Sequence, residues 1–415
     1  MKTRLARVAL GLAAAFVLSA GLAQSAAARP AMHGNHGAAP RHIFVIMMEN
    51  HGTAEILGNP ADAPFITKLA AHANVETNYF GVTHPSLPNY LSTISGSFQG
   101  IWDDCKAGAD VLCAPEEFIP GSGDGTAGDY LSAAQIASAS ATPHLFSGGN
   151  IVDQLETSGL SWRAYMQSMP AAGSQVEYWP VLDTPTGPTT VKLYAQKHNP
   201  FMYFSDINYP GSPRLANIVP FKFKSFASDL RSGNVPNFVW ISPDQCNDIH
   251  GGIYTAVAGH PETPCPYSDV AGDAADESLK AKADAFLKST VSTIMHSRAW
   301  TRNSVIFVTA DETDYDGSNP SDNFYLSTAG CCDSPTLPAG DPAVSATWPG
   351  GVYGGGLVPM IVVTANGPRH AKSATAYNHY SMLLTIEEGF GLGKLAYTAD
   401  SNQVKPLWSL VAPRH

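Results

Sequence analysis

Four short apolar runs, separated by amphipathic stretches, restrict the possible folds of this chain more than any other feature. The runs are FVIMM (44–48), NFVWIS (237–242), SVIFVT (304–309) and LVPMIVVTA (357–365). Helical patterns follow or separate them, at residues 64–73, 276–299 and 379–390. Strands that are apolar along their whole length are typical of parallel sheets with both faces covered. The sequence therefore predicts an α/β fold with a mostly parallel central sheet sandwiched by helices.

Three of these runs are followed by side chains that can bind metals. The residues are Glu49 and Asn50 after the first run, Asp248 and His250 after the second, and Asp311 and Glu312 after the third. In any single loop such residues could be helix caps or turn formers. The carboxyl ends of parallel strands, however, meet at one edge of the sheet, where ligand sites form. The three loops together therefore predict one shared metal site.

The types of side chain narrow the choice of ion. Three carboxylates and one amide, from Glu49, Asn50, Asp311 and Glu312, offer hard oxygen donors that favour calcium, magnesium or manganese over zinc. A second group comprises Asp248, His250 and His379. This group could hold a second, more zinc-like ion, or it could supply proton donors and phosphate contacts. Both alternatives stay open at this stage.

The segment VTHPSLPNYLSTISG (82–96) contains the candidate nucleophile, Ser86, which lies between Pro85 and Pro88. A hydroxyl at such a turn can bind the ion and also attack the substrate, because the metal lowers its pKa. The alternative is that Ser86 only caps a helix. Asn89 in the same segment carries an amide that could hydrogen-bond a phosphoryl oxygen, and His84 also favours a functional role.

The first 28 residues have the pattern of a signal peptide. Lys2, Arg4 and Arg7 precede an apolar stretch, and Ala26–Ala28 offer a small-residue cleavage site. The apolar stretch is shorter than the roughly 20 residues of a membrane anchor. We therefore expect a secreted protein without an integral membrane anchor, cleaved near Ala28. Residues 29–41 are then a flexible lead-in and residues 42–415 a single domain.

Charge and cysteine content limit the partners and the compartment. The net charge is −11, and loss of three cations with the signal peptide gives −11 − 3 = −14. An acidic chain with 14% charged residues lacks the basic face of a nucleic-acid binder. Six cysteines in an exported chain favour disulfides. Proximity favours the pairs Cys105–Cys113, Cys246–Cys265 and Cys331–Cys332, although six cysteines allow about 15 connectivities.

Five stretches, in this order, resemble a known family. They are MMEN (47–50), HPSLPNYL (84–91), NDIHGG (247–252), VTADE (308–312) and NHYSMLLTIEEGFGL (378–392). They are similar to the phosphoesterase family of bacterial and fungal secreted acid phosphatases and phosphatidylcholine-type phospholipases C, in the alkaline phosphatase superfamily. The resemblance implies an alkaline-phosphatase-like fold with loop insertions. It also implies a metal bound by Glu49, Asn50, Ser86, Asp311 and Glu312, with Asp248, His250 and His379 near the phosphoryl group.

The function expected from this resemblance is metal-dependent hydrolysis of phosphate esters through a phosphoserine on Ser86, with His250 or His379 protonating the leaving group. The sequences ENHGTAE and DETDYDG depart from the phospholipase branch and favour a phosphomonoesterase. The substrate is then a small phosphorylated compound, the alternative being a phospholipid head group acted on by a phospholipase C. Two non-enzymatic alternatives are an exported phosphate- or metal-binding protein and a disulfide-braced adhesin. The oligomeric state is not predicted.

Overall fold

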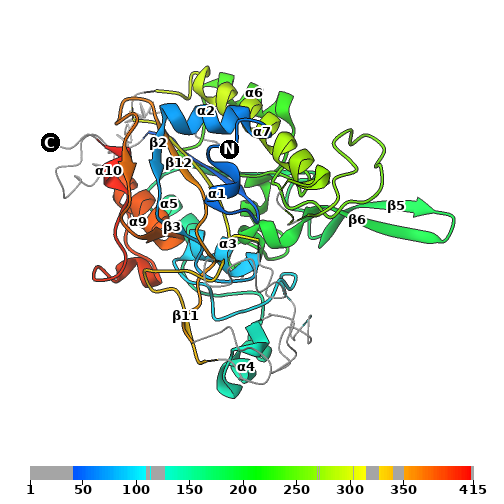
Figure 1. Cartoon of the computed structure of the whole chain (residues 1–415), viewed down its shortest axis with the longest axis horizontal. Coiled ribbons are helices and arrows are strands. Elements are labelled where there is room, and N and C mark those ends of the chain that lie inside the picture. The colour runs from blue at the N-terminus through cyan, green and yellow to red at the C-terminus, as the bar shows by residue number, and fades with distance from the viewer. Residues whose placement is uncertain are drawn as a thin grey trace, which may run out of the picture. The chain divides into compact units, whose positions relative to one another are not determined.

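A central sheet organises the computed structural model, which describes residues 41–108, 113, 127–268, 270, 272–301, 303–314, 327–339 and 350–412 (Figure 1). Eight strands form this sheet within the described residues. In spatial order they are β13 (Lys372–Ser373), β2 (Asn74–Glu76), β12 (Met360–Thr364), β9 (Val305–Ala310), β1 (Ile43–Met48), β8 (Phe238–Ser242), β4 (Trp162–Gln167) and β7 (Ile218–Phe221). Of these eight, β12 alone runs antiparallel to its neighbours. The predicted α/β class with a mostly parallel sheet is confirmed.

The three strands expected to supply the site lie side by side at the centre of the sheet. β1 pairs in parallel with β9 on one side and β8 on the other, and Met48 is aligned with Ala310. All residues of these three strands are buried, which explains their apolar composition on both faces. Their carboxyl ends therefore lie at one edge of the sheet.

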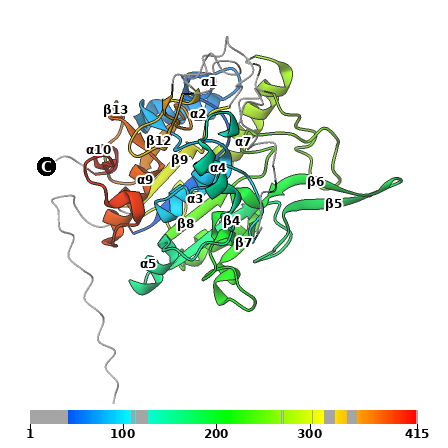
Figure 2. The same ribbon diagram turned by 90° about the horizontal axis from the view of Figure 1, so that it is seen from below.

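Helices cover both faces of the sheet (Figure 1, Figure 2). One layer contains α2 (Pro64–His72), α6 (Phe223–Ser232) and α7 (Ala274–Met295). The other contains α3 (Ser86–Ser95), α5 (Ile151–Thr157) and α9 (His379–Phe390). The helix predicted at 379–390 has these bounds. The one predicted at 276–299 starts earlier, because Asp273 caps it through the amides of Ala275 and Asp276, and ends at Met295.

Helix α3 is buried along its whole length although it contains several hydroxyl groups. Ser92 and Ser95 satisfy theirs within the helix, on the carbonyls of Pro88 and Leu91, each at 2.8 Å. The helix stops at Gly96, whose φ is +69° and whose added Cβ would lie 2.3 Å from the Leu395 carbonyl oxygen. A residue with a side chain would not fit there, so the end of α3 is fixed by packing.

A long hairpin, β5 (Tyr178–Thr184) and β6 (Gly187–Ala195), extends from the rest of the described chain (Figure 1, Figure 2). It is not among the elements predicted from the sequence. β6 runs directly into the 3-10 helix η3 (Gln196–His198), whose His198 lies 3.0 Å from Glu49, the residue that follows β1. The shorter elements are α1 (Thr53–Ile56), β3 (Tyr79–Phe80), η2 (Ala127–Asp129), α4 (Ala133–Ser140), η4 (Pro200–Tyr203), η5 (Pro213–Asn217), β10 (Thr336–Leu337), β11 (Gly351–Val352), β14 (Tyr377–Asn378), η6 (Ala396–Ala399) and α10 (Trp408–Val411).

The cysteines pair as proximity predicted. Cys105–Cys113, Cys246–Cys265 and the adjacent Cys331–Cys332 are disulfides. The described chain falls in a unit that extends from Met32 to His415. The predicted signal peptide and residues 29–40 of the predicted lead-in lie outside the described residues. Among the helices of the described residues, none combines the length and apolar character needed to cross a membrane.

Candidate active site

The Ser86 hydroxyl lies between two carboxylates that come from different strands. Ser86 is the first residue of α3 and is 2% exposed. Its Oγ lies 3.1 Å from Glu49 Oε2 and 3.0 Å from Glu312 Oε1, so its single hydrogen can be donated to either carboxylate. Glu49 directly follows β1, and Glu312 lies two residues beyond β9. The structure thus brings together three residues that are far apart in sequence.

Asp311 adds a third buried carboxylate at this edge. Its backbone N–H donates to the Met48 carbonyl at 3.1 Å, and its Oδ1 accepts from the Asn50 N–H at 3.1 Å. Its Oδ2 is buried and has no hydrogen-bond partner among the described residues. Burial, together with the charges of Glu49 and Glu312, raises the pKa of Asp311 well above its ordinary value. This excess of negative charge fits a site for a cation.

The types of donor atom at this edge fit a hard divalent ion. The carboxylate oxygens of Glu49, Asp311 and Glu312, however, do not form one compact group. Groups of three acid, histidine or cysteine donors within 4.8 Å of one another do occur in the described chain, and Glu49, Asp311 and Glu312 are not one of them. Only Glu49 and Glu312 are connected, through the Ser86 hydroxyl that lies between them. Asn50 is placed beside Asp311 by its backbone. The unpartnered Asp311 oxygen and the oxygen-rich donor set are therefore the features that fit an ion here.

Two cationic residues that the sequence analysis missed complete the site. Lys197 Nζ donates to Asp104 Oδ2 at 2.7 Å and to Ser86 Oγ at 3.3 Å. Burial alone would lower the pKa of Lys197, but the charges of Asp104 and Glu49 outweigh it, so the pKa is raised. Lys197 therefore places a permanent positive charge beside the Ser86 hydroxyl.

His198 connects the two predicted groups of site residues. Its Nε2 lies 3.0 Å from Glu49 Oε1, and its Nδ1 lies 3.5 Å from Asp248 Oδ2. Its ring stacks on Tyr90, with 5.1 Å between the centroids. Burial lowers its pKa, but the charge of Glu49 and the hydrogen bonds to both acids raise it to about 9 overall. The same contacts lower the pKa of Glu49, although burial opposes this.

Asp248 and His250 lie beside this pair, as expected from the loop after β8. Asp248 Oδ1 accepts from the His250 N–H at 2.8 Å, and the His250 ring lies 6.0 Å from that of His198. Burial raises the pKa of Asp248 to about 6, with His198 opposing the shift. Burial and the charge of Lys197 lower the pKa of His250 to about 4. At neutral pH His250 is thus a neutral imidazole, placed beside His198 and Asp248.

His379 and Asn89 are placed as supports of the site. His379 Nε2 contacts the Asp311 carbonyl at 2.6 Å, and its Nδ1 contacts the Tyr79 hydroxyl at 3.0 Å, so both ring nitrogens are occupied. Burial lowers the pKa of His379 to about 4. The Asn89 amide spans the loop before α3, accepting from the Val82 and Thr83 N–H groups and donating to the Thr83 and Pro85 carbonyls. Substrate contacts by these two residues stay predictions.

His84 holds the other side of Glu312. Its Nδ1 contacts Glu312 Oε2, and its Nε2 lies 2.8 Å from the Ser327 carbonyl oxygen. Burial lowers the pKa of His84 to about 4, which favours the neutral ring. His84 thus fixes the orientation of the carboxylate that accepts the Ser86 hydrogen bond.

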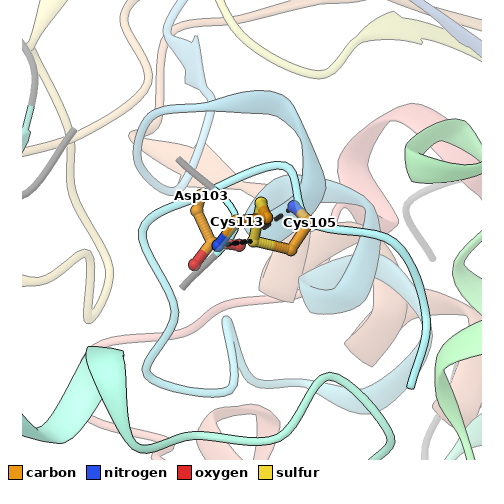
Figure 3. A group of neighbouring side chains, drawn as sticks. All are labelled: Asp103, Cys105 and Cys113. Carbon is orange, nitrogen blue, oxygen red and sulfur yellow. Dashed lines mark hydrogen bonds between the residues drawn. A yellow bond between two sulfur atoms is a disulfide. The ribbon is translucent and has the colours of Figure 1, made fainter. Parts of the chain in front are cut away.

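The neighbours of Asp104 in the sequence belong to a group of side chains, Asp103, Cys105 and Cys113, which Figure 3 shows. Asp103 Oδ1 accepts from the Cys105 N–H at 3.0 Å and contacts His144 Nε2 at 2.6 Å. Cys105 is bonded to Cys113, so its sulfur is no thiolate ligand. Asp103, Cys105 and Cys113 therefore act as a structural brace for Asp104 and not as a metal centre.

Comparison with known proteins identifies the family. Residues 59–263 and 267–393, which include Ser86, Asp248, Asp311 and Glu312, match the sequence profile of the Phosphoesterase family. The chain belongs to this family. The match begins after Glu49, whose place in the site comes from the structure.

Several known proteins are similar to the chain at low identity. A probable acid phosphatase of Kluyveromyces lactis is 28% identical over 214 residues, 52% of this chain and 40% of the relative. A phosphate-repressible acid phosphatase of Penicillium chrysogenum is 24% identical over 80% of this chain and 55% of the relative. The chain thus spans about half the length of these two. A phosphatidylinositol-3-phosphatase of Mycobacterium tuberculosis is 25% identical over 88% of this chain and 82% of the relative.

Similar solved structures include a phosphonate monoester hydrolase of Agrobacterium radiobacter. It is 12% identical, with 90% of this chain and 77% of that one covered and a TM-score of 0.44. A protein of the alkaline phosphatase superfamily from Vibrio parahaemolyticus is also 12% identical, with 86% and 68% covered and a TM-score of 0.44.

Proposed function

We propose that this protein hydrolyses phosphoric esters with Ser86 as the nucleophile. The observation that carries the proposal is the Ser86 hydroxyl, held 3.0 and 3.1 Å from two carboxylate oxygens. The position of Ser86 as the first residue of α3 supports it further, because the amino end of a helix favours bound phosphate. The family and the names of the relatives agree with this class of reaction.

Glu49, Asn50, Ser86, Asp311 and Glu312 would hold the divalent ion, for which magnesium, calcium or manganese suits the oxygen donors. When bound, the ion would lower the pKa of the serine hydroxyl and neutralise charge on the phosphoryl oxygens. Asp248 and His250 are set beside this group and would contact the substrate. His379 would hold the backbone of Asp311 in place through its contact with the Asp311 carbonyl oxygen.

The first step transfers the phosphoryl group to the serine. Ser86 Oγ forms a bond to phosphorus while the bond from phosphorus to the leaving oxygen breaks in line. The serine proton passes to Glu312 Oε1, which lies 3.0 Å away. Lys197 stabilises the negative charge that develops on the serine oxygen. His250 in its protonated form, which its pKa of about 4 restricts to acidic pH, gives a proton to the leaving oxygen, so that the alcohol departs uncharged.

The second step reverses this geometry. Water attacks the phosphoserine, gives its proton to His250 and takes the phosphoryl group, while the bond between Ser86 Oγ and phosphorus breaks. Glu312 returns the proton to the serine oxygen. The products are inorganic phosphate and the starting enzyme, so no other reactant is required.

The proposed substrate is a phosphomonoester, and the proposed location is outside the cell. The three relatives named above are acid phosphatases and a phosphatidylinositol-3-phosphatase, and these names all denote removal of a terminal phosphate. The disulfides are compatible with export. A phospholipase C would instead cleave a phosphodiester, which makes the two alternatives separable by assay.

The test is a hydrolysis panel of p-nitrophenyl phosphate, bis-p-nitrophenyl phosphate and phosphatidylcholine, each with and without chelator. We expect chelator-sensitive release of phosphate from the monoester and at least about tenfold less activity on the others. Ser86→Ala should be inactive, whereas Ser92→Ala, a buried serine of the same helix, should remain active. A panel with no hydrolysis, and with phosphate binding unchanged in Ser86→Ala, would instead identify a non-catalytic binding protein.

A further inference from the structure

A second group of metal-binding side chains lies at the same edge of the sheet, in the loop after β8. Asp244, His260 and Glu262 each present one ligand atom, and these atoms all lie within 4.8 Å of one another. Asp244 comes two residues after the end of β8, and the other two residues belong to a loop about sixteen residues further on. The group thus joins two separate parts of the chain.

The buried member has room for one more partner. Asp244 is 1% exposed, and its carboxylate accepts hydrogen bonds from the Ser168 hydroxyl at 2.6 Å and from Asn247 at 2.9 and 3.2 Å. A carboxylate has about four acceptor positions, so these three bonds leave one position available. They also fix the orientation of the carboxylate, as the supporting contacts of metal ligands do.

The other two members are reachable from solvent and held in place. His260 is 27% exposed and Glu262 is 18% exposed, with Nδ1 and Oε1 3.0 Å apart. The loop is closed by the Cys246–Cys265 disulfide, and the hydroxyl of Thr263 bonds to both the Val257 N–H and the His260 carbonyl. An ion could therefore enter from solvent and meet ligands that are already ordered.

The local charge also favours a cation. Asp248 is a third acid near Asp244 and Glu262. Burial, together with the charges of Glu262 and Asp248, raises the pKa of Asp244 to about 7. The ammonium group of Lys282 on α7 interacts electrostatically with the Glu262 carboxylate. Because Asp248 is already paired with His198, the local balance is one ammonium group against the carboxylates of Asp244 and Glu262, and a divalent ion would offset the remaining negative charge.

We propose that Asp244, His260 and Glu262 form a second metal site, distinct from the Ser86 centre, for a divalent ion that accepts nitrogen and oxygen ligands, such as Zn²⁺. Two carboxylates and an imidazole are a suitable set for zinc, with water in the remaining position. The ion would tie the disulfide-closed loop to the start of the segment that carries Asp248 and His250. Asp248 and His250 themselves are not part of this group, and neither is His379.

This proposal is independent of the hydrolytic function, and zinc stoichiometry tests it. The full-length protein is freed of metal by chelator and titrated with ZnCl₂ in competition with a chromophoric zinc indicator. His260→Ala and Glu262→Gln should each lose one equivalent of bound zinc, or bind that equivalent at least about tenfold more weakly. Hydrolytic activity should stay within about twofold of wild type, because neither residue belongs to the Ser86 centre.

Two controls separate this site from others. His296→Ala removes an exposed histidine just beyond α7 and should leave the zinc stoichiometry unchanged. Asp311→Asn should leave the equivalent lost in His260→Ala intact, whatever it does to the catalytic ion. If the wild type, His260→Ala and Glu262→Gln all bind the same number of zinc ions, the proposal is wrong. The contact between His260 and Glu262 is then an ordinary hydrogen bond. Circular dichroism of both variants excludes misfolding as the cause of a loss.

Discussion

Lys197 is the residue whose charge most directly affects the Ser86 oxygen. Its ammonium lies 3.3 Å from Ser86 Oγ and is anchored by Asp104. We predict that Lys197→Met lowers kcat by about 10²-fold or more, the usual effect of removing a donor at a developing negative charge. Steady-state kinetics on a phosphomonoester measures this.

The matched control for that change is Lys192→Met in strand β6. Lys192 lies over the Tyr178 ring at 4.5 Å, away from the Ser86 centre, so its loss should leave kcat almost unchanged. If both lysine variants lose activity equally, the effect is structural and Lys197 has no special role. If Lys197→Met keeps normal kcat, the charge beside Ser86 is not used in the reaction.

The acidic residues of the site could be predicted from the sequence, whereas its cationic residues could not. Glu49, Asp311 and Glu312 follow central parallel strands, so the rule that ligand sites lie at the carboxyl edge was sufficient. Lys197 and His198 follow β6, a strand of the hairpin outside the central sheet, and that rule does not reach them. The adjacent cations of the QKHN stretch, in a chain with 24 basic and 35 acidic residues, were the available signal.

At the scale of elements, α7 is tied to the loop after β1 by a buried charge pair. Asp276 accepts from Lys280 Nζ at 2.7 Å, and its other oxygen lies 3.1 Å from His51 Nε2. We predict that Asp276→Asn lowers the free energy of unfolding by about 3 kcal/mol, because Lys280, 3% exposed, then loses its anionic partner. Urea unfolding at pH 7 measures this, with the exposed Glu277→Gln of the same helix as a control expected within about 0.5 kcal/mol of wild type.

The same pair makes a prediction about pH. Burial would raise the pKa of Asp276, but the hydrogen bonds of His51 and Lys280 lower it to about 2. A carboxyl whose folded pKa lies below the unfolded value of about 3.9 stabilises the fold above that pH and loses the effect as the pH falls. The difference between wild type and Asp276→Asn should therefore shrink between pH 4 and pH 2. A difference that stays constant over this window would contradict the pairing.

Periodicity predicted the central elements well and the peripheral ones poorly. β1, β8 and β9 are apolar on both faces, and α9 is buried along nearly its whole length, so their apolar patterns are strong. The reversed direction of β12 depends on the path of the chain between β9 and β12, which carries no periodic signal. The hairpin was missed because its strands are only partly buried and contain threonine and proline, so they lack a continuous apolar pattern.

At the scale of the whole molecule, removal of metal should affect stability as well as activity. Glu49, Asp311 and Glu312 are buried, and their mutual repulsion is relieved by a cation. An ion present at 100 times its dissociation constant adds about 2.7 kcal/mol to the free energy of unfolding. We predict that chelation lowers the melting temperature and abolishes hydrolysis, and that magnesium, calcium or manganese restores both.

Asp311→Asn gives this prediction a sharper form. It removes one of the repelling charges, so the metal-free variant should melt above the metal-free wild type, while added metal should stabilise it less. Differential scanning fluorimetry on four samples, each protein with and without metal, compares these effects. If chelator leaves the melting temperature of the wild type unchanged, the proposed ion at the Ser86 centre is contradicted.

The phosphoserine on Ser86 is the central claim, and direct trapping tests it. The enzyme is mixed briefly with p-nitrophenyl phosphate at low pH, quenched with acid and digested, and the peptide containing residues 82–96 is analysed by mass spectrometry. The competing hydroxyl is Thr83, which is buried and donates to the His84 carbonyl oxygen at 3.5 Å. We predict phosphate on Ser86 in the wild type and in Thr83→Ser, and none in Ser86→Ala. Phosphate on Thr83, or a Ser86→Ala enzyme with near-normal turnover, would contradict the account.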